Sequence, residues 1–183
     1  MSKQFTTKDN RTVWLRPAVE DDAEAIIRAV DMVAREGRYF LRSRFEHGVE
    51  QERAFLTQTA EQGNLFLLAL LDDLLVGWVT LFRAPHEFRR HTAELGIGVL
   101  RAYRGIGIGE VLMDQALRWA AGQGIEKVTL GVRAGNERAQ ALYHKLGFVE
   151  EGCRVRDVKD QNGRYDDTIE MSYFVPQAPG EVR

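Results

Sequence analysis

The sequence contains very little cysteine. Cys153 is the only one among 183 residues, so an intrachain disulfide framework is excluded, and with it the small secreted scaffolds that depend on such bonds. Residues 1–10 are polar and lack the apolar core of a signal peptide. We therefore expect a cytoplasmic protein.

Long apolar runs, cationic excess and metal-ligand patterns are also missing. The most apolar stretch, residues 65–82, is divided by Asp72 and Asp73, and each part is far shorter than the roughly 20 residues that span a bilayer. The formal net charge is −2, whereas proteins that track nucleic-acid phosphates are usually cationic. No metal-ligand spacing links the four histidines, His47, His86, His91 and His144. We expect no membrane segment, no nucleic-acid partner and no metal.

Hydrophobic residues make up 44% of the chain, which is enough for one substantial core. We predict a single domain, residues 1–175, and a flexible tail, residues 176–183. Alternation predicts a strand at 12–16, apolar runs predict a hairpin of strands at 65–71 and 74–82, and a β-branched run predicts a strand at 127–132. Further strands are predicted at 93–99, 148–158 and 165–174. Helical spacing predicts helices at 20–33, 51–61, 109–121 and 137–146, with an irregular segment at 35–48. The pattern favours an α/β (α+β) fold with a mixed, mostly antiparallel sheet, in which the strands at 93–99 and 127–132 are parallel.

A glycine-rich turn joins the strand that ends at Val99 to the next helix. Gly105, Gly107 and Gly109 let backbone N–H groups converge without a Cβ in the way, and the first amides of a helix attract anions. The dinucleotide pattern G-x-G-x-x-G fails here, because its last position holds Glu110 or Leu112, and no Gly-Lys-Ser/Thr triplet occurs. The turn therefore predicts a phosphate site of another kind.

The remaining pattern is Arg-x-x-Gly-x-Gly, carried by Arg104, Gly107 and Gly109 directly after a strand. It resembles the acyl-CoA pyrophosphate loop of the GCN5-related N-acetyltransferase (GNAT) superfamily. A second stretch, residues 136–148, resembles the superfamily's asparagine at a strand end, followed by a helix that carries a tyrosine and ends in Gly-Phe. The resemblance covers residues 92–152 closely and the rest of the chain by element order.

The resemblance implies a sheet that splays open beside Val99 to admit acetyl-CoA, the cosubstrate. It also implies that backbone groups of Gly98 and Val99 bond the pantetheine arm, with the Val99 N–H a donor to the thioester oxygen. The cofactor-binding residues that it implies are Gly98, Val99, Arg104, Gly105, Ile106, Gly107, Ile108, Gly109, Asn136 and Tyr143.

Two of these residues have a second interpretation. Tyr143 is suited to be the general acid, since a phenol keeps its proton at neutral pH and can give it to a departing thiolate. It lies on the apolar face of its helix, however, and could equally be a core aromatic with a bonded hydroxyl. Asn136 is explained as a helix N-cap, and the resemblance adds a contact with pantetheine.

The general base is less clearly indicated. Ribosomal-protein alanine acetyltransferases carry a glutamate five residues before the equivalent asparagine, and that position here is Gly131. Glu94 resembles the strand glutamate of histone acetyltransferases but lies one residue out of register, which reverses its face unless a bulge intervenes. Glu94 is thus a candidate base acting through water, or a strand-end carboxylate paired with an arginine.

We expect direct acetyl transfer to a primary amine, with a small amine or amino acid as the acceptor. The acidic pair Asp166 and Asp167 could attract such a cation. Three alternatives stay open: a protein N-terminal acetyltransferase, a non-catalytic acyl-CoA-binding module, and an interaction protein that keeps the fold without the cofactor. Because dimers are frequent in the superfamily, the resemblance also implies a homodimer.

Overall fold

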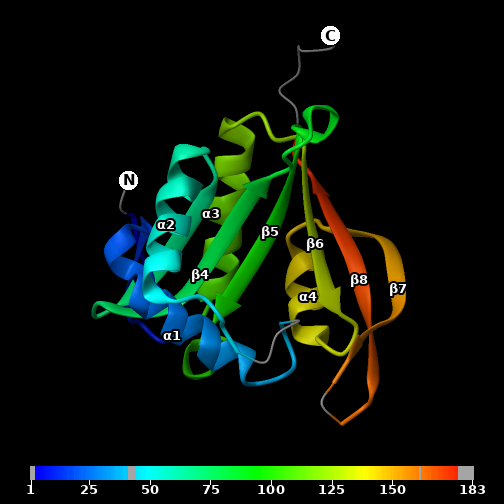
Figure 1. The fold of residues 1–183 in the computed structure, drawn as a ribbon, viewed down its shortest axis with the longest axis horizontal. Coiled ribbons are helices and arrows are strands. Elements are labelled where there is room, and N and C mark those ends of the chain that lie inside the picture. Colours follow the sequence, from blue (N-terminus) through cyan, green and yellow to red (C-terminus); the bar gives the residue numbers. More distant parts are fainter. Residues whose placement is uncertain (1–2, 41–43, 161, 177–183) are drawn as a thin grey trace. The chain divides into compact units, whose positions relative to one another are not determined.

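The computed structural model describes residues 3–40, 44–160 and 162–176. Within them the strands form one sheet in the order β1-β2-β3-β4-β5-β6-β8-β7, which confirms the mixed, mostly antiparallel class (Figure 1). The strands are β1 (Lys3–Thr6), β2 (Thr12–Pro17), β3 (Leu65–Leu71), β4 (Leu74–Arg83), β5 (Thr92–Val99), β6 (Lys127–Arg133), β7 (Val149–Lys159) and β8 (Tyr165–Phe174). The α-helices are α1 (Ala23–Ala34), α2 (Val49–Glu61), α3 (Ile108–Gly122) and α4 (Glu137–Lys145). Three short 3₁₀ turns accompany them, η1 (Glu20–Asp22), η2 (Glu87–Arg89) and η3 (Arg101–Tyr103).

The chain divides into two compact units. The first comprises residues 1–80 and 96–113, and the second comprises residues 81–95 and 114–183. Strands β4 and β5 and helix α3 each run from one unit into the other. The single domain of residues 1–175 stays a prediction, and most of the expected flexible tail, residues 177–183, lies outside the described residues.

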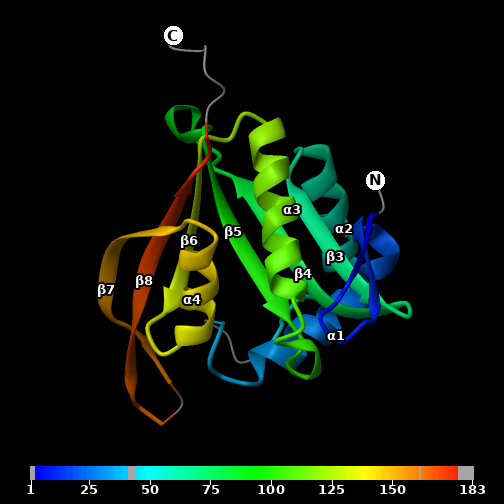
Figure 2. The same cartoon turned by 180° about the vertical axis from the view of Figure 1, so that it is seen from behind.

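In the first unit, helices α1 and α2 cover one face of the strands β2 to β4 (Figure 1), while the view from behind shows the start of α3 on the opposite face (Figure 2). Gly77 explains the close approach of α3, because a Cβ there would lie 3.3 Å from both Ile108 and Leu112. The predicted hairpin around Asp72 and Asp73 is confirmed, with both residues at positive φ as a two-residue turn requires. The buried core of this unit includes Ile26, Val33, Leu56, Leu68, Trp78 and Leu100.

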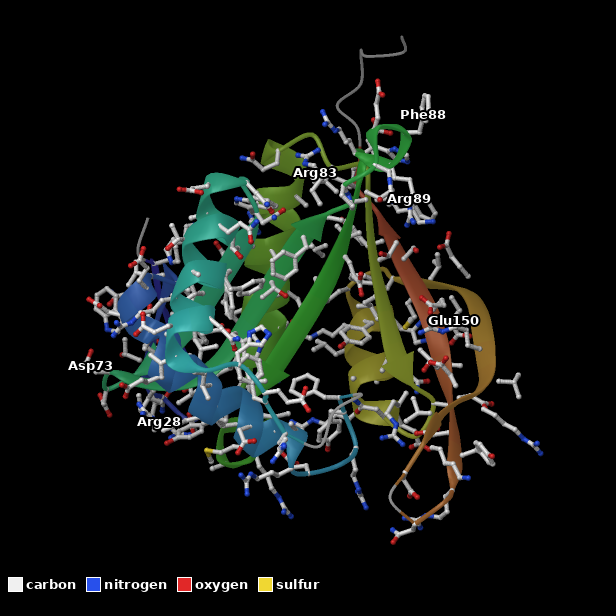
Figure 3. The ribbon with its side chains drawn as sticks, viewed as in Figure 1. Arg28, Asp73, Arg83, Phe88, Arg89 and Glu150 are labelled. Carbon is white, nitrogen blue, oxygen red and sulfur yellow. The ribbon has the colours of Figure 1, made fainter. Side chains whose placement is uncertain are left out.

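In the second unit, β5 pairs with β6 in parallel and β8 pairs antiparallel with both β6 and β7. Helix α4 begins at the predicted cap, since the Asn136 side chain accepts a hydrogen bond from the Ala139 N–H at 3.3 Å. It ends at Lys145 with Leu146 as its C-cap, and the next residue, Gly147, has a φ of +92°, the left-handed conformation that glycine adopts readily. Between β4 and β5, the turn η2 projects Phe88 and Arg89 away from the ribbon (Figure 3).

The structure departs from the predicted elements in two places. Strand β1 was not predicted, because its four residues are mostly polar and lack the apolar alternation of a half-buried strand. The helix predicted at 20–33 starts as the turn η1, since the Asp22 carboxylate accepts from the Val19 N–H at 2.8 Å and pairs with Arg16 at 2.6 Å. Other boundaries differ by about two residues, as frayed ends usually do. The helices in the described residues are all too short or too polar to cross a membrane.

Candidate active site

The glycine-rich turn lies in the first unit and leads directly into α3. Gly105 and Gly107 have φ values of +90° and +99°, a conformation that other residues rarely adopt. The first helical hydrogen bond runs from the Val111 N–H to the Gly107 carbonyl, so the amides of Ile108 and Gly109 precede the helical ladder. The turn thus places early helix amides where an anion would be attracted.

Backbone contacts hold this turn from two sides. The Lys8 N–H, in the turn after β1, donates to the Ile106 carbonyl at 3.0 Å. The Leu100 N–H donates to the Val76 carbonyl of β4 at 2.9 Å. The turn is therefore held by the N-terminal hairpin and by the sheet, and neither contact can be read from the local sequence.

The guanidinium of Arg104 makes three hydrogen bonds inside the first unit. Its Nε donates to the Val99 carbonyl at 2.8 Å, and its two terminal nitrogens bond the Glu36 carboxylate at 2.8 and 2.6 Å. The Tyr39 ring lies against its flat face, with 4.8 Å from the guanidinium carbon to the ring centroid. The side chains of Arg104 and Glu36 are only 17% and 21% exposed. Sequence reasoning placed Arg104 on the cofactor and gave Glu36 no role.

The end of β5 is shaped by Trp78 of β4. A Cβ on Gly98 would lie 2.3 Å from the Trp78 indole, so only glycine lets the ring cross the strand here. The parallel ladder between β5 and β6 pairs Thr92, Ala93 and Glu94 with Lys127, Val128 and Thr129, and stops there. Pairing thus ends before Val99, in agreement with a sheet that splays at this strand.

Asn136 and Tyr143 lie in the second unit, at the cap and on the inner face of α4. Tyr143 is 7% exposed and packs on Phe148, with ring centroids 5.8 Å apart. Burial raises the pKa of the Tyr143 phenol to about 12, so it keeps its proton at neutral pH. Among the described residues, no hydrogen bond involves the Tyr143 hydroxyl. Every fully buried side-chain polar atom there has a hydrogen-bond partner, so the Tyr143 oxygen is not itself fully buried. The hydroxyl is therefore uncommitted, which weakens the interpretation of Tyr143 as a core aromatic with a bonded hydroxyl.

Glu94 is an exposed residue of β5 in the second unit, beside Thr129 of β6. Among the described residues no arginine pairs with it, so the arginine-bound interpretation lacks its partner. It remains a candidate base.

Gly131, where the ribosomal-protein alanine acetyltransferases carry a glutamate, is surrounded by side chains of β7 and β8. Gly131 stands opposite Glu170 of β8. A Cβ on Gly131 would lie 3.2 Å from the Thr168 methyl, 3.6 Å from a terminal nitrogen of Arg154 and 3.9 Å from the Glu170 Oε1. The space of the absent side chain is thus bordered by Arg154 and Glu170, which form an ion pair at 2.9 Å.

The acidic pair in β8 makes structural bonds. Asp166 pairs with Arg133 at 2.8 Å, and the Asp167 carboxylate accepts from the Arg156 N–H at 2.7 Å. Arg156 itself has a φ of +55°, and this hydrogen bond holds it in the irregular part of β7. Asp166 is engaged by Arg133 of β6 and Asp167 by the backbone of β7, so their expected attraction for a cationic amine lacks support.

The predicted site residues fall into two sets. Residues 98–109 belong to the first unit, and Glu94, Asn136 and Tyr143 belong to the second. Among the described residues no group of three or more histidine, cysteine, aspartate or glutamate side chains could hold a metal ion.

Comparison with known proteins gives one family and several relatives. The family model described as "Acetyltransferase (GNAT) family" matches residues 30–148. The N-alpha-acetyltransferase RimI of Mycobacterium tuberculosis is 38% identical over 107 residues, 56% of this chain and 63% of that protein. The matched segment is thus less than two thirds of that relative.

Solved structures agree with the fold. A GNAT-family acetyltransferase from Streptococcus pneumoniae has a TM-score of 0.85 at 28% identity, covering 89% of this chain and 99% of the other. A phosphinothricin acetyltransferase from Sinorhizobium meliloti, solved with acetyl-CoA, has a TM-score of 0.84 at 18% identity and covers 97% and 92%. At that identity the second likeness shows the fold alone.

Proposed function

Because the chain belongs to the acetyltransferase (GNAT) family, we propose that it transfers acetyl from acetyl-CoA directly to the primary amine of a small amine or amino acid. The observation that carries the proposal is the turn before α3, where Gly105 and Gly107 take left-handed conformations just ahead of the first helical amides. Such a turn suits a pyrophosphate. The free thiol of CoA would be the second product.

The same chain supplies groups for the rest of the donor. The backbone of Gly98 and Val99, beyond the end of the β5–β6 ladder, is suited to bond an extended pantetheine arm as a strand would. The Asn136 side chain caps α4 through its oxygen, which leaves its amide nitrogen for the same arm.

The chemistry needs three contributions from the protein. Glu94, acting through a water molecule, takes a proton from the acceptor ammonium, so that the amine nitrogen can attack the thioester carbon. The Val99 N–H donates to the thioester oxygen as negative charge develops there. As the carbon–sulfur bond breaks, the Tyr143 hydroxyl gives its proton to the departing thiolate. The attacking nitrogen, which still carries one proton more than the product amide, releases that proton to solvent, and the Tyr143 phenolate takes up a proton from solvent.

A second acceptor class is a protein N-terminus. The likeness to RimI, an N-alpha-acetyltransferase, favours it. The absence of a side chain at Gly131, where the ribosomal-protein alanine acetyltransferases carry a glutamate, argues for the small acceptor. A cytoplasmic location and a homodimer also belong to this proposal, on the single cysteine and on the frequency of dimers in the superfamily.

The test follows CoA thiol release from acetyl-CoA across a panel of small amines, amino acids and a peptide with an N-terminal alanine. We expect release with at least one small acceptor and little with the peptide. Turnover confined to the peptide would favour the N-terminal acetyltransferase. Tight CoA binding without turnover would favour a binding module. If acetyl-CoA fails to raise the melting temperature, an interaction protein without cofactor is favoured.

A further inference from the structure

Two cations lie beside the glycine-rich turn, and their surroundings differ. We infer that Lys8 contacts the pyrophosphate of CoA, whereas Arg104 is a positioning residue that fixes the turn through Glu36 and Val99. The inference rests on the proposed function, because it concerns the same acetyl-CoA site. It is carried by contacts within the first unit alone.

The charge of Arg104 is already matched inside the protein. Three of its five N–H donors, one on each nitrogen, bond protein oxygens, and Tyr39 stacks on its flat face. A cation whose charge is neutralised by a bidentate carboxylate offers little to a second anion. To offer a phosphate the two donors that now bond Glu36, Arg104 would have to leave that carboxylate unpaired in a largely buried position, which is costly.

The bonds of Arg104 do have a geometric effect. They tie the Val99 carbonyl, at the strand end, to Glu36, just beyond the end of α1. Tyr39 and Phe40 follow Glu36, and the Phe40 ring lies 6.3 Å from the Trp78 ring, which in turn crosses Gly98. Arg104 therefore connects the start of the glycine-rich turn with the segment that leaves α1.

Lys8 is in the opposite situation. Its backbone N–H donates to the Ile106 carbonyl, which fixes it against the turn. A Cβ on Gly107 would lie 3.9 Å from its Cγ and 4.0 Å from its Cε, so the side chain runs along the glycine. The ammonium is one bond of about 1.5 Å beyond Cε.

The charge of Lys8 is not neutralised locally. Within the described residues no carboxylate pairs with its ammonium. The neighbouring Asp9 is bound instead by Arg11, at 2.6 Å. Lys8 thus brings an exposed positive charge to the left-handed glycine that precedes the amides of α3, which favours contact with an anion bound there.

Isothermal titration of CoA into the 183-residue chain and into its Glu36→Gln variant separates the two roles by the direction in which the CoA Kd changes. If Arg104 positions the turn, the substitution raises the CoA Kd about tenfold, because the guanidinium loses its anchor. If Arg104 is a phosphate ligand restrained by Glu36, the same substitution leaves the Kd unchanged or lowers it. The control is Glu24→Gln, which breaks an exposed ion pair between Glu24 and Arg28, both in α1, and should leave the CoA Kd unchanged. Figure 3 labels Arg28.

The Lys8→Gln variant tests the other assignment. We expect its CoA Kd to rise about fivefold, as for loss of one solvent-exposed charge contact, while Lys3→Gln on the same hairpin has no effect. The rise should persist with dephospho-CoA, which keeps the pyrophosphate and lacks the 3′-phosphate. A rise that vanishes with dephospho-CoA would move the contact to the 3′-phosphate and overturn the assignment, as would no rise at all.

The melting temperature of each variant shows whether it is folded. If Glu36→Gln is unfolded, Glu36→Asp replaces it as the more conservative variant. Wild-type protein that fails to bind CoA would overturn the proposed function and this inference together. Wild-type binding combined with unchanged or tighter binding by Glu36→Gln would overturn the role of Arg104 and leave the proposed function standing.

Discussion

The glycine-rich turn before α3 and the strand β7 at the sheet edge both carry arginine ion pairs, but they hold them differently. In the turn, Arg104 and Glu36 are mostly shielded from water, with 17% and 21% of their side chains exposed. In the hairpin, Arg154 and Glu170 are 56% and 38% exposed. A shielded pair restricts the backbone around it, whereas an exposed pair can exchange partners with solvent.

The comparison also separates what each region can recognise. The turn offers backbone amides and left-handed glycines, which suit a phosphate in any protein that contains them. The hairpin instead offers the side chains of an exposed strand, whose chemistry is set by the individual residues and not by the backbone. The structure therefore indicates the acetyl donor, CoA, far more firmly than the amine that accepts the acetyl group.

The largest effect is expected where the second unit has its own shielded pair. Asp166→Ala removes a carboxylate that pairs with Arg133, whose side chain is 11% exposed, and should lower the free energy of unfolding by about 3 kcal/mol. Urea unfolding measures the change. A loss below about 0.5 kcal/mol, the level of a surface pair, would show that this pair behaves like the exposed ones.

Tyr143→Phe removes the proposed acid without changing the ring that packs on Phe148. The expected result is a fall in kcat of about 100-fold, with the CoA Kd nearly unchanged. Steady-state kinetics and titration calorimetry provide the two values. Unchanged turnover would remove Tyr143 as the acid.

Gly107→Ala tests the left-handed glycine directly. At a φ of +99° a Cβ is strained, so the turn should shift and the CoA Kd should rise about tenfold. The matched control is Gly122→Ala at the other end of α3, where a Cβ would meet nothing within 4 Å. That control should bind CoA normally and gain about 0.5 kcal/mol of stability.

Glu170→Gln breaks the exposed pair beside Gly131. We expect a loss of stability below about 1 kcal/mol and an unchanged CoA Kd. Acceptor KM is the informative value, because a change there would place this strand next to the acceptor. A raised CoA Kd would show that this hairpin, like the glycine-rich turn, affects binding of the acetyl donor.

The smallest effect concerns alkaline pH. Burial raises the pKa of Tyr143 to about 12, and the acid form is present below that value. Loss of the Tyr143 proton should therefore not lower kcat up to about pH 10, the ordinary phenol value. A pH profile of kcat checks this, and a decline below pH 10 that disappears in Tyr143→Phe would contradict the pKa.

Much of the fold could be predicted because its signals are local. The Asn136 cap, the Gly147 stop and the parallel order of β5 and β6 follow from spacing alone. Strand β1 could not be predicted, since its register is imposed by β2.

In the candidate site, too, the local features could be predicted and the contacts between distant segments could not. The turn itself is a contiguous motif, whereas the partners of Arg104 and of the turn come from distant parts of the sequence. Glu36 reaches Arg104 from the end of α1, and Lys8 reaches Ile106 from the N-terminal hairpin. One sequence without the fold cannot reveal such pairs.

Amine-dependent release of CoA thiol, measured together with the mass of the acetylated amine, tests the central claim most directly. Direct N-acetyl transfer gives one acetylated amine for each thiol released, and no release when the amine is omitted. Thiol release that does not depend on any amine, or an amine that stays unmodified while thiol appears, would contradict direct N-acetyl transfer.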